Sequence, residues 1–206
     1  MSRVADHADS FLNRIDRLHA CCVRVEKQFG LKRLGVIDAE LVYASSFLSI
    51  CCQWEGFLES ALLEVVCGAP SHKPRRKRLA TFKGKKHFRE VLLYPGKEYI
   101  GLESLRKTIA LTELYVPDGM PFSEVSEVNQ TYLQQAVLVR NAIAHQTDVA
   151  IRKFRANVPG VSSLSKQKRT PGAFLRHQFR HGPNQTRFDL YAIAFKSAAS
   201  EIKGAW

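Results

Sequence analysis

Residues 38–67, "DAELVYASSFLSICCQWEGFLESALLEVVC", decide the fold class of the chain. Asp38 can cap a helix here, and Gly68 followed by Pro70 can end it. Apolar side chains form a wide band along this helix: Leu41, Phe47, Leu48, Cys51, Trp54, Leu58, Leu62 and Val65. A helix with such a wide apolar band is covered by neighbours on several sides. The stretch therefore predicts the central helix of an all-α protein.

Segments on both sides of this stretch repeat apolar residues every three or four positions, which is the spacing of one helix face. The pattern predicts helices over 4–29 and 99–115, a long helix from a cap at Ser123 to about Pro159, and a last helix that ends at Gly204. The chain is 45% hydrophobic, so these helices can bury a substantial core. We therefore predict an up-and-down helical bundle.

Two segments fall outside the predicted bundle. Residues 69–98 and 160–186 are rich in Pro, Gly, Lys, Arg and His, and both are long for loops in a compact domain. We predict one domain over 1–206 that carries a long basic insertion at 69–98 and a basic loop at 160–186. Within the insertion, Val91 to Tyr94 could form a short strand.

The chain is strongly basic. Its 31 Lys and Arg residues against 19 Asp and Glu give a formal net charge of +12. Such a field favours polyanionic partners, with nucleic acid ahead of an anionic membrane surface. Nine of the cations, and no acid, lie within 72–89: Lys73, Arg75, Arg76, Lys77, Arg78, Lys83, Lys85, Lys86 and Arg89.

The 72–89 segment could be an arm that binds RNA phosphates, with Phe82 and Phe88 available to stack on bases. The alternative is a solvated basic loop or a localisation signal. The loop at 160–186 adds further basic residues: Lys166, Lys168, Arg169, Arg176, His177, Arg180 and His181. His177 and His181 have a spacing that could hold a metal on a helix, but no carboxylate or cysteine accompanies them. Basic surface is the favoured interpretation, and we expect no metal or other cofactor.

The cysteines indicate a reducing compartment. Cys21, Cys22, Cys51, Cys52 and Cys67 lie in apolar helical segments without a CxxC pair, so we interpret them as reduced core residues. The N-terminal residues have no apolar core of a signal peptide. The longest uncharged apolar stretch, 41–54, is too short to span a bilayer. We expect a cytoplasmic protein without membrane contact.

The stretch "VLVRNAIAHQ", residues 137–146, places polar side chains inside an otherwise apolar helix. Asn141 and His145 are four residues apart and share a face, whereas the directions of Arg140 and His145 differ by roughly 140°. A buried arginine is costly unless it is paired. One interpretation is therefore a buried ion pair with Glu55, which occupies a similar position on the central helix.

The second interpretation is chemical. Cleavage of RNA without a metal needs a group that moves protons and a cation that stabilises the phosphate. Histidine titrates near neutral pH, and arginine is always charged and forked, so His145 and Arg140 suit these tasks. Asn141 could bind phosphate or orient the imidazole. Asp148 could also hold the ring, although a solvated helix residue is the simpler interpretation of Asp148.

The segment "VRNAIAHQ" resembles the R-x4-6-H motif of the HEPN superfamily in its common RN-x-x-x-H form, with Arg140, Asn141 and His145 at the matching positions. A second likeness is "FLSICCQWEGFLESALLE", 47–64, which is similar to the early HEPN helix around Glu55. The order of elements is most similar to RiboL-PSP-type HEPN proteins. The resemblance covers roughly residues 40–150.

The resemblance implies an α-helical bundle that dimerises and a metal-independent endoribonuclease of toxin–antitoxin or defence systems. It implies that Arg140 and His145 are catalytic, that Asn141 supports them, and that the site forms where the motif helices of two subunits meet. One toxin subgroup has a tyrosine immediately before the histidine, which its antitoxin nucleotidylates. Here that residue is Ala144, so this route of neutralisation is not expected.

Three hypotheses follow, in order of preference. The first is a HEPN endoribonuclease, a toxin or anti-phage defence effector, that acts on RNA as a homodimer with an antitoxin or defence-system partner protein. The second is a non-catalytic HEPN-like nucleic-acid-binding or adaptor subunit. The third is a basic interaction protein with no role in nucleic-acid binding. The first two differ in whether His145 matters for RNA cleavage.

Overall fold

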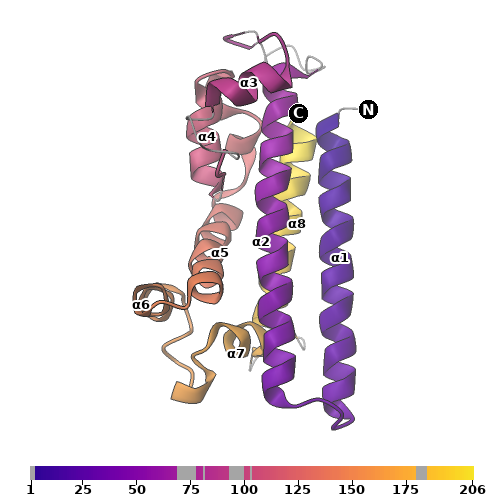
Figure 1. Ribbon diagram of the computed structural model, residues 1–206, viewed down its shortest axis with the longest axis vertical. Helices are drawn as coiled ribbons and strands as arrows, with labels where there is room; N and C mark the ends of the chain where they lie inside the picture. The colour runs from indigo at the N-terminus through magenta and orange to yellow at the C-terminus, as the bar shows by residue number, and fades with distance from the viewer. Residues whose placement is uncertain (1–2, 69–77, 81, 93–99, 103, 180–184) are drawn as a thin grey trace. The chain divides into compact units, whose positions relative to one another are not determined.

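The structure is a computed structural model that describes residues 3–68, 78–80, 82–92, 100–102, 104–179 and 185–206 (Figure 1). These residues form eight α-helices: α1 (Arg3–Gly30), α2 (Val36–Cys67), α3 (Lys85–Leu92), α4 (Leu105–Glu113), α5 (Glu127–His145), α6 (Asp148–Asn157), α7 (Pro171–Arg176) and α8 (Arg187–Ala205). Short 3₁₀ helices lie at Pro117–Gly119, Phe122–Glu124 and Lys166–Lys168. No β-strand occurs in these ranges. The predicted all-α class is confirmed.

The predicted central helix is present as α2. Phe47, Trp54 and Leu58 of its apolar band are buried. The helix begins at Val36 rather than at Asp38, because the Asp38 carboxylate accepts a hydrogen bond from the Gly35 N–H at 3.0 Å from within the first turn. By length and composition alone α2 could cross a membrane, but core helices of soluble proteins meet the same criteria.

The described residues form two compact units. One comprises Met1–Leu12, Gln53–Gln130 and Lys196–Trp206. In this unit Phe11 of α1 packs on Trp54 and Phe57 of α2, with ring centroids 5.5 Å apart in both pairs. The fully buried Phe88 attaches α3 to the same unit, since its ring lies 5.0 Å from that of Tyr115.

The other unit comprises Asn13–Cys52 and Thr131–Phe195. Tyr43 and Phe47 of α2 meet Phe188 and Tyr191 of α8 edge-on, with ring centroids 5.5 Å apart in both pairs. Tyr132 of α5 also packs against Tyr191, at 6.1 Å between centroids. Aromatic side chains of α8 therefore connect α2 with α5 within this unit, which also contains the motif residues 140–145.

The long helix expected from Ser123 to about Pro159 is wrong. Ser123 lies in a 3₁₀ helix, and the helical segment that follows is two helices, α5 and α6. The backbone turns at Gln146, whose φ is +50°. Thr147 then caps α6, because its hydroxyl accepts a hydrogen bond from the Ala150 N–H at 3.3 Å. A capping threonine two residues after His145 therefore overrides the continuous apolar spacing.

The insertion at 69–98 is more ordered than the sequence predicts. Val91 and Leu92 end α3 instead of forming a strand, while Leu93 and Tyr94 lie outside the described residues. The helix expected over 99–115 is shorter, because the Ser104 side chain caps α4 at its start.

The segment at 160–186 is also not a simple loop. It contains α7, in which Ala173, Phe174 and Leu175 are buried. A Cβ atom added at Gly172 would lie 2.5 Å from the carbonyl oxygen of Glu40. This close approach to the α2 backbone means that α7 is part of the packed structure rather than a solvated excursion.

The cysteines are only partly core residues. All five are free thiols within helices, and Cys22 and Cys51 are buried as expected. Cys21 and Cys67 are half-buried, and Cys52 is exposed, so the core interpretation is wrong for Cys52. Burial raises the pKa of the Cys22 thiol to about 12, which keeps it protonated and unreactive.

Candidate functional site

The motif side chains converge at the C-terminal end of α5. The Arg140 guanidinium donates a hydrogen bond from Nη1 to Asn141 Oδ1 at 3.1 Å. The same Nη1 lies 3.4 Å from His145 Nε2. His145 is the last residue of the helix. One short segment therefore brings a cation, an amide and an imidazole together.

This convergence is not expected from helix directions alone. The Cα directions of Arg140 and His145 differ by roughly 140° on a regular helix. The long arginine side chain nevertheless reaches the imidazole, because His145 lies at the helix end, immediately before the backbone turns at Gln146. A single helix can therefore bring both side chains to one point.

The motif site is partly buried at one end and exposed to solvent at the other. Val139 and Ala142, which flank Arg140 and Asn141, are buried and fix this part of α5. Arg140 and Asn141 are half-buried, and Arg140 Nε itself is buried. The imidazole of His145 is exposed. A ligand can therefore reach the imidazole from solvent while the guanidinium stays anchored beneath it.

The chemistry available follows from the hydrogen-bonding inventory. Arginine has donors only, so the His145 Nε2 atom that faces Arg140 can share a hydrogen bond only through its lone pair. A lone pair on an imidazole nitrogen can also accept a proton. Beside it stand a permanent cation and an amide that can bind an anionic oxygen. The arrangement suits proton transfer next to a phosphate.

Asp148 does not occupy the position that a continuous helix would give it. It lies in the first turn of α6, beyond the turn at Gln146, and it is exposed. Its spacing of three residues from His145 therefore does not place it on the same helix face. Its exposure agrees with the simpler interpretation of Asp148 as a solvated helix residue. A supporting role for Asp148 stays a prediction.

Glu55 lies on α2 and is half-buried. It belongs to the compact unit that contains Gln53–Gln130, whereas Arg140 belongs to the unit that contains Thr131–Phe195. The proposed pairing of Glu55 with the motif helix therefore stays a prediction.

The basic arm is partly committed to internal contacts. Arg78 donates hydrogen bonds to the backbone carbonyls of Val65 and Gly68 at 2.9 and 2.6 Å, at the C-terminal end of α2. Lys85 forms an ion pair with the buried Glu64, and Arg89 forms one with Glu59. These contacts hold the three cations against α2 and leave them less available to an external anion.

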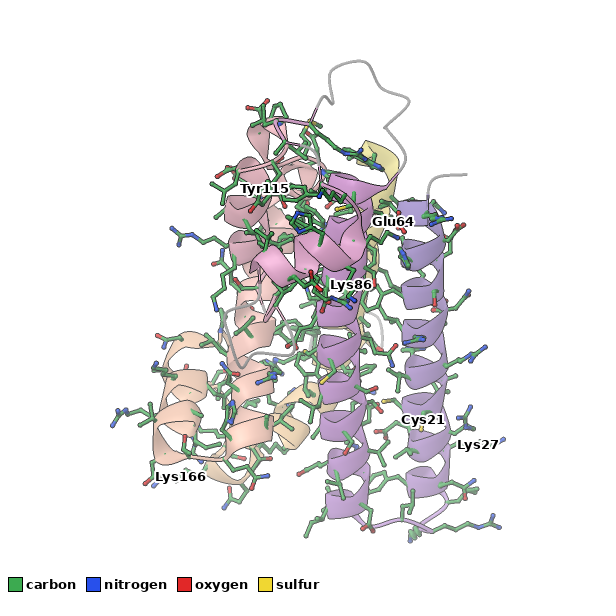
Figure 2. The ribbon with its side chains drawn as sticks, turned by 45° about the horizontal axis from the view of Figure 1, so that its top comes forward. Cys21, Lys27, Glu64, Lys86, Tyr115 and Lys166 are labelled. Carbon is green, nitrogen blue, oxygen red and sulfur yellow. The ribbon has the colours of Figure 1, made fainter. Side chains whose placement is uncertain are left out.

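Of the remaining arm residues, two are exposed lysines and four lie outside the described residues. Lys83 and Lys86 are exposed, and Figure 2 shows Lys86 on α3. Lys73, Arg75, Arg76 and Lys77 lie outside the described residues. The expectation that Phe88 stacks on bases is wrong, because its side chain is fully buried. Phe82 is half-buried against Phe88, at 4.6 Å between ring centroids.

The second basic segment is also used internally in part. Arg176 forms a two-pronged ion pair with Glu26, with Nε to Oε1 at 2.7 Å and Nη2 to Oε2 at 3.0 Å. Its guanidinium also lies 4.0 Å from the ring centre of Phe29. Arg169 donates to the carbonyls of Leu164 and Ser162, at 2.8 Å each.

Of the two histidines in this segment, the structure describes His177 but not His181. His177 is the C-cap residue that follows α7, and its Nδ1 atom lies 3.0 Å from Arg187 Nη1. His181 and Arg180 lie outside the described residues. Among the residues that are described, no group of three or more His, Cys, Asp or Glu side chains is arranged to hold a metal ion.

Three cations that the sequence patterns did not single out lie directly after the motif. Arg152, Lys153 and Arg155 are all exposed on α6. A signal for them was present, because the sequence contains no acid between Asp148 and Asp189.

No family model, curated protein or solved structure matches the chain. A function for this chain is therefore inferred from its own residues and their geometry.

Proposed function

We propose that the chain is a metal-independent endoribonuclease of HEPN type, folded as a HEPN-like helical bundle. One observation carries the proposal: Arg140, Asn141 and His145, the residues that resemble the HEPN motif, converge within hydrogen-bonding range at an accessible helix end. A lone surface histidine would not suggest catalysis. An imidazole beside a guanidinium on a chain of net charge +12 suits a polyanionic substrate.

In the proposed reaction the 2′-hydroxyl oxygen of one nucleotide attacks the adjacent phosphorus atom. The bond from phosphorus to the 5′-oxygen of the next nucleotide breaks, which leaves a 2′,3′-cyclic phosphate and a 5′-hydroxyl. His145 accepts the proton of the 2′-hydroxyl or supplies one to the leaving oxygen. Arg140 stabilises the negative charge that develops on the phosphoryl oxygens. Asn141 holds Arg140 in place through the hydrogen bond from Nη1.

The proposed active form is a homodimer in which the motif helices of two subunits meet. An isologous interface brings the same patch together twice, so the cleft would contain two copies of Arg140 and His145. One imidazole can then accept the first proton while the other supplies the second. The proposed setting is the cytoplasm, where the enzyme acts as a toxin or anti-phage defence effector with an antitoxin or defence-system partner.

The test is RNA cleavage in the presence of EDTA. The products should carry a 2′,3′-cyclic phosphate, which is identified by mass spectrometry of a short oligonucleotide. Arg140→Ala and His145→Ala should each abolish cleavage, and Asn141→Ala should reduce it. Matched controls are Arg24→Ala on α1 and His87→Ala on α3, which remove the same side-chain types from exposed helix positions.

All variants should keep the helical circular dichroism spectrum of the parent protein. Cleavage that persists in His145→Ala, or that EDTA removes, contradicts the proposal. If RNA binds but no variant or parent protein cleaves it, the non-catalytic HEPN-like binding subunit becomes the better description.

A further inference from the structure

The outer face of α6 is a cationic surface that the motif does not account for. Arg152, Lys153 and Arg155 are exposed on this helix, and Asp148 in its first turn is the one acid that α6 contains. The 40 residues between Asp148 and Asp189 contain nine Lys and Arg residues and no acid. The three cations of this face therefore outnumber the one carboxylate near them in the sequence.

The orientation of α6 is fixed by its buried side. Phe154 is fully buried, and its ring lies 5.4 Å edge-on from that of Phe174 in α7. Positions 152, 153 and 155 lie about 100° or more around the helix from Phe154. Since Phe154 is held inward, the three cations must point to solvent. The face is thus a built feature of the fold rather than a mobile tail.

The same face lies close to the motif. Only Gln146 and Thr147 separate His145 from the start of α6, and all of these residues belong to one compact unit. Chain geometry limits the distance between the Cα atoms of His145 and Arg152 to about 17 Å. Figure 1 shows α6 beside the C-terminal end of α5. A polyanion bound at the motif would meet α6 within a few nucleotides.

Several arginines and one lysine of the other basic segments are less suited to this role, although each segment also has exposed lysines. In the arm, Arg78, Lys85 and Arg89 contact carbonyls or carboxylates of the chain itself. Near α7, Arg169 and Arg176 are held in the same way. Cations that already have internal partners gain less from a phosphate, because the existing contact must first be broken.

We propose that the α6 face, defined as Arg152, Lys153 and Arg155, binds the phosphates of single-stranded RNA on one side of the cleaved bond. The identification of the partner as RNA rests on the proposed function. A single strand fits better than a duplex, because attack by the 2′-hydroxyl needs a backbone that can bring the attacking and leaving oxygens into line. Contacts to phosphate supply affinity without sequence preference.

The test compares two triple variants with the same change in charge. One is Arg152→Ala with Lys153→Ala and Arg155→Ala. The matched control is Arg17→Ala with Arg24→Ala and Lys27→Ala, three exposed cations of α1 in the same compact unit. Figure 2 shows Lys27 projecting outward from α1. Both triples should keep the parent's thermal midpoint, since all six positions are exposed.

Binding is measured by fluorescence anisotropy with a labelled 2′-O-methyl oligonucleotide, which is single-stranded and lacks the attacking hydroxyl. Each lost phosphate contact lowers the slope of log affinity against log salt by about 0.7 for a single strand, so the α6 triple should lower it by about 2. The same term predicts a loss of about a hundredfold in affinity at 0.1 M salt. The control triple should change the slope by far less.

An unchanged slope in the α6 triple, or an equal loss in both triples, overturns the proposal. The proposal is also overturned if the α6 triple loses binding to phosphatidylserine vesicles while its binding to the oligonucleotide is unchanged. The α6 face and the nuclease can fail separately. If the parent protein cleaves no RNA but the α6 triple lowers the salt slope, the RNA-binding surface is supported and the nuclease is not. If cleavage depends on His145 but the α6 triple leaves the slope unchanged, only the proposed surface is refuted.

Discussion

Arg140 Nη1 lies 3.4 Å from His145 Nε2, although the two residues are five positions apart on α5. The same nitrogen donates to Asn141 Oδ1 at 3.1 Å, so one guanidinium links both other motif residues. Because arginine offers donors only, a hydrogen bond between these two nitrogens needs the lone pair of the Nε2 atom. An anionic phosphate entering between them would exchange this weak contact for charge-assisted hydrogen bonds.

The forked shape of Arg140 should matter, and not only its charge. Arg140→Lys keeps one positive charge but replaces a planar group that can contact two partners with a single ammonium. We expect the cleavage rate to fall by roughly tenfold or more, since a hydrogen bond to a charged group contributes about 1.5–3 kcal/mol. Initial rates on a short RNA provide the measurement, and Arg24→Lys is the control. A rate equal to that of the parent would show that charge alone suffices.

Glu55 should affect activity more than stability. We predict that its carboxylate orients the motif helix, so Glu55→Gln should lower the cleavage rate while the urea midpoint stays nearly constant. Glu55→Leu should leave the fold as stable as the parent or more stable, because replacing a desolvated ion pair by apolar contacts is often neutral or stabilising. Glu90→Gln, at an exposed position of α3, is the control. Equal losses of activity in Glu55→Gln and Glu90→Gln would refute the role.

The composite site makes activity depend on concentration. If two motif helices must meet, activity per chain should fall on dilution below the dissociation constant of the dimer. Analytical ultracentrifugation and cleavage assays over the same concentration series provide the comparison. Mixing the parent chain with an excess of His145→Ala should also lower the activity per parent chain, because most parent chains then enter mixed dimers. A monomer at micromolar concentration whose activity per chain is constant contradicts the composite site.

Phe154 should contribute strongly to the stability of the packing that holds α6. Phe154→Ala removes a fully buried ring that contacts Phe174, and such truncations cost about 3–5 kcal/mol. Urea unfolding measures the loss. The exposed Val149→Ala on the same helix should change the free energy of unfolding by about 0.5 kcal/mol or less. A loss below about 1 kcal/mol in Phe154→Ala would mean that α6 is not anchored as the packing implies.

The raised pKa of the Glu40 carboxyl should make the free energy of unfolding depend on pH. Burial raises its pKa, and the positive charges of Arg176 and Lys168 only partly oppose this shift. A carboxyl whose folded-state pKa exceeds its unfolded value favours folding most below the unfolded value of about 4.3, and this contribution is lost as pH rises through the folded pKa. Glu40→Gln, which stays neutral, should therefore gain stability relative to the parent between pH 4 and pH 7. Denaturant unfolding at both pH values measures the difference, and a relative loss at pH 7 would reverse the sign.

Helix content was predictable because it depends on local patterns. The apolar spacing in α1 and the wide band in α2 gave both helices to within about two residues. The division between α5 and α6 was not predicted, because Gln146 and Thr147 interrupt a spacing that otherwise continues in phase. Capping chemistry outweighs periodicity at such a point, since Thr147 satisfies a backbone donor at the new helix start.

The sequence by itself determined that this is a basic, helical chain and that Arg140, Asn141 and His145 are the residues to examine. Those features depend on residue type and on spacing along one helix. Only the tertiary structure decided which cations pair with a carboxylate from a distant segment. Lys85 and Arg89 look identical to Arg152 and Arg155 in the sequence, but the first two meet Glu64 and Glu59 on α2, whereas burial of Phe154 turns the other two to solvent. The partners of a long charged side chain come from distant parts of the chain, so local spacing cannot specify them.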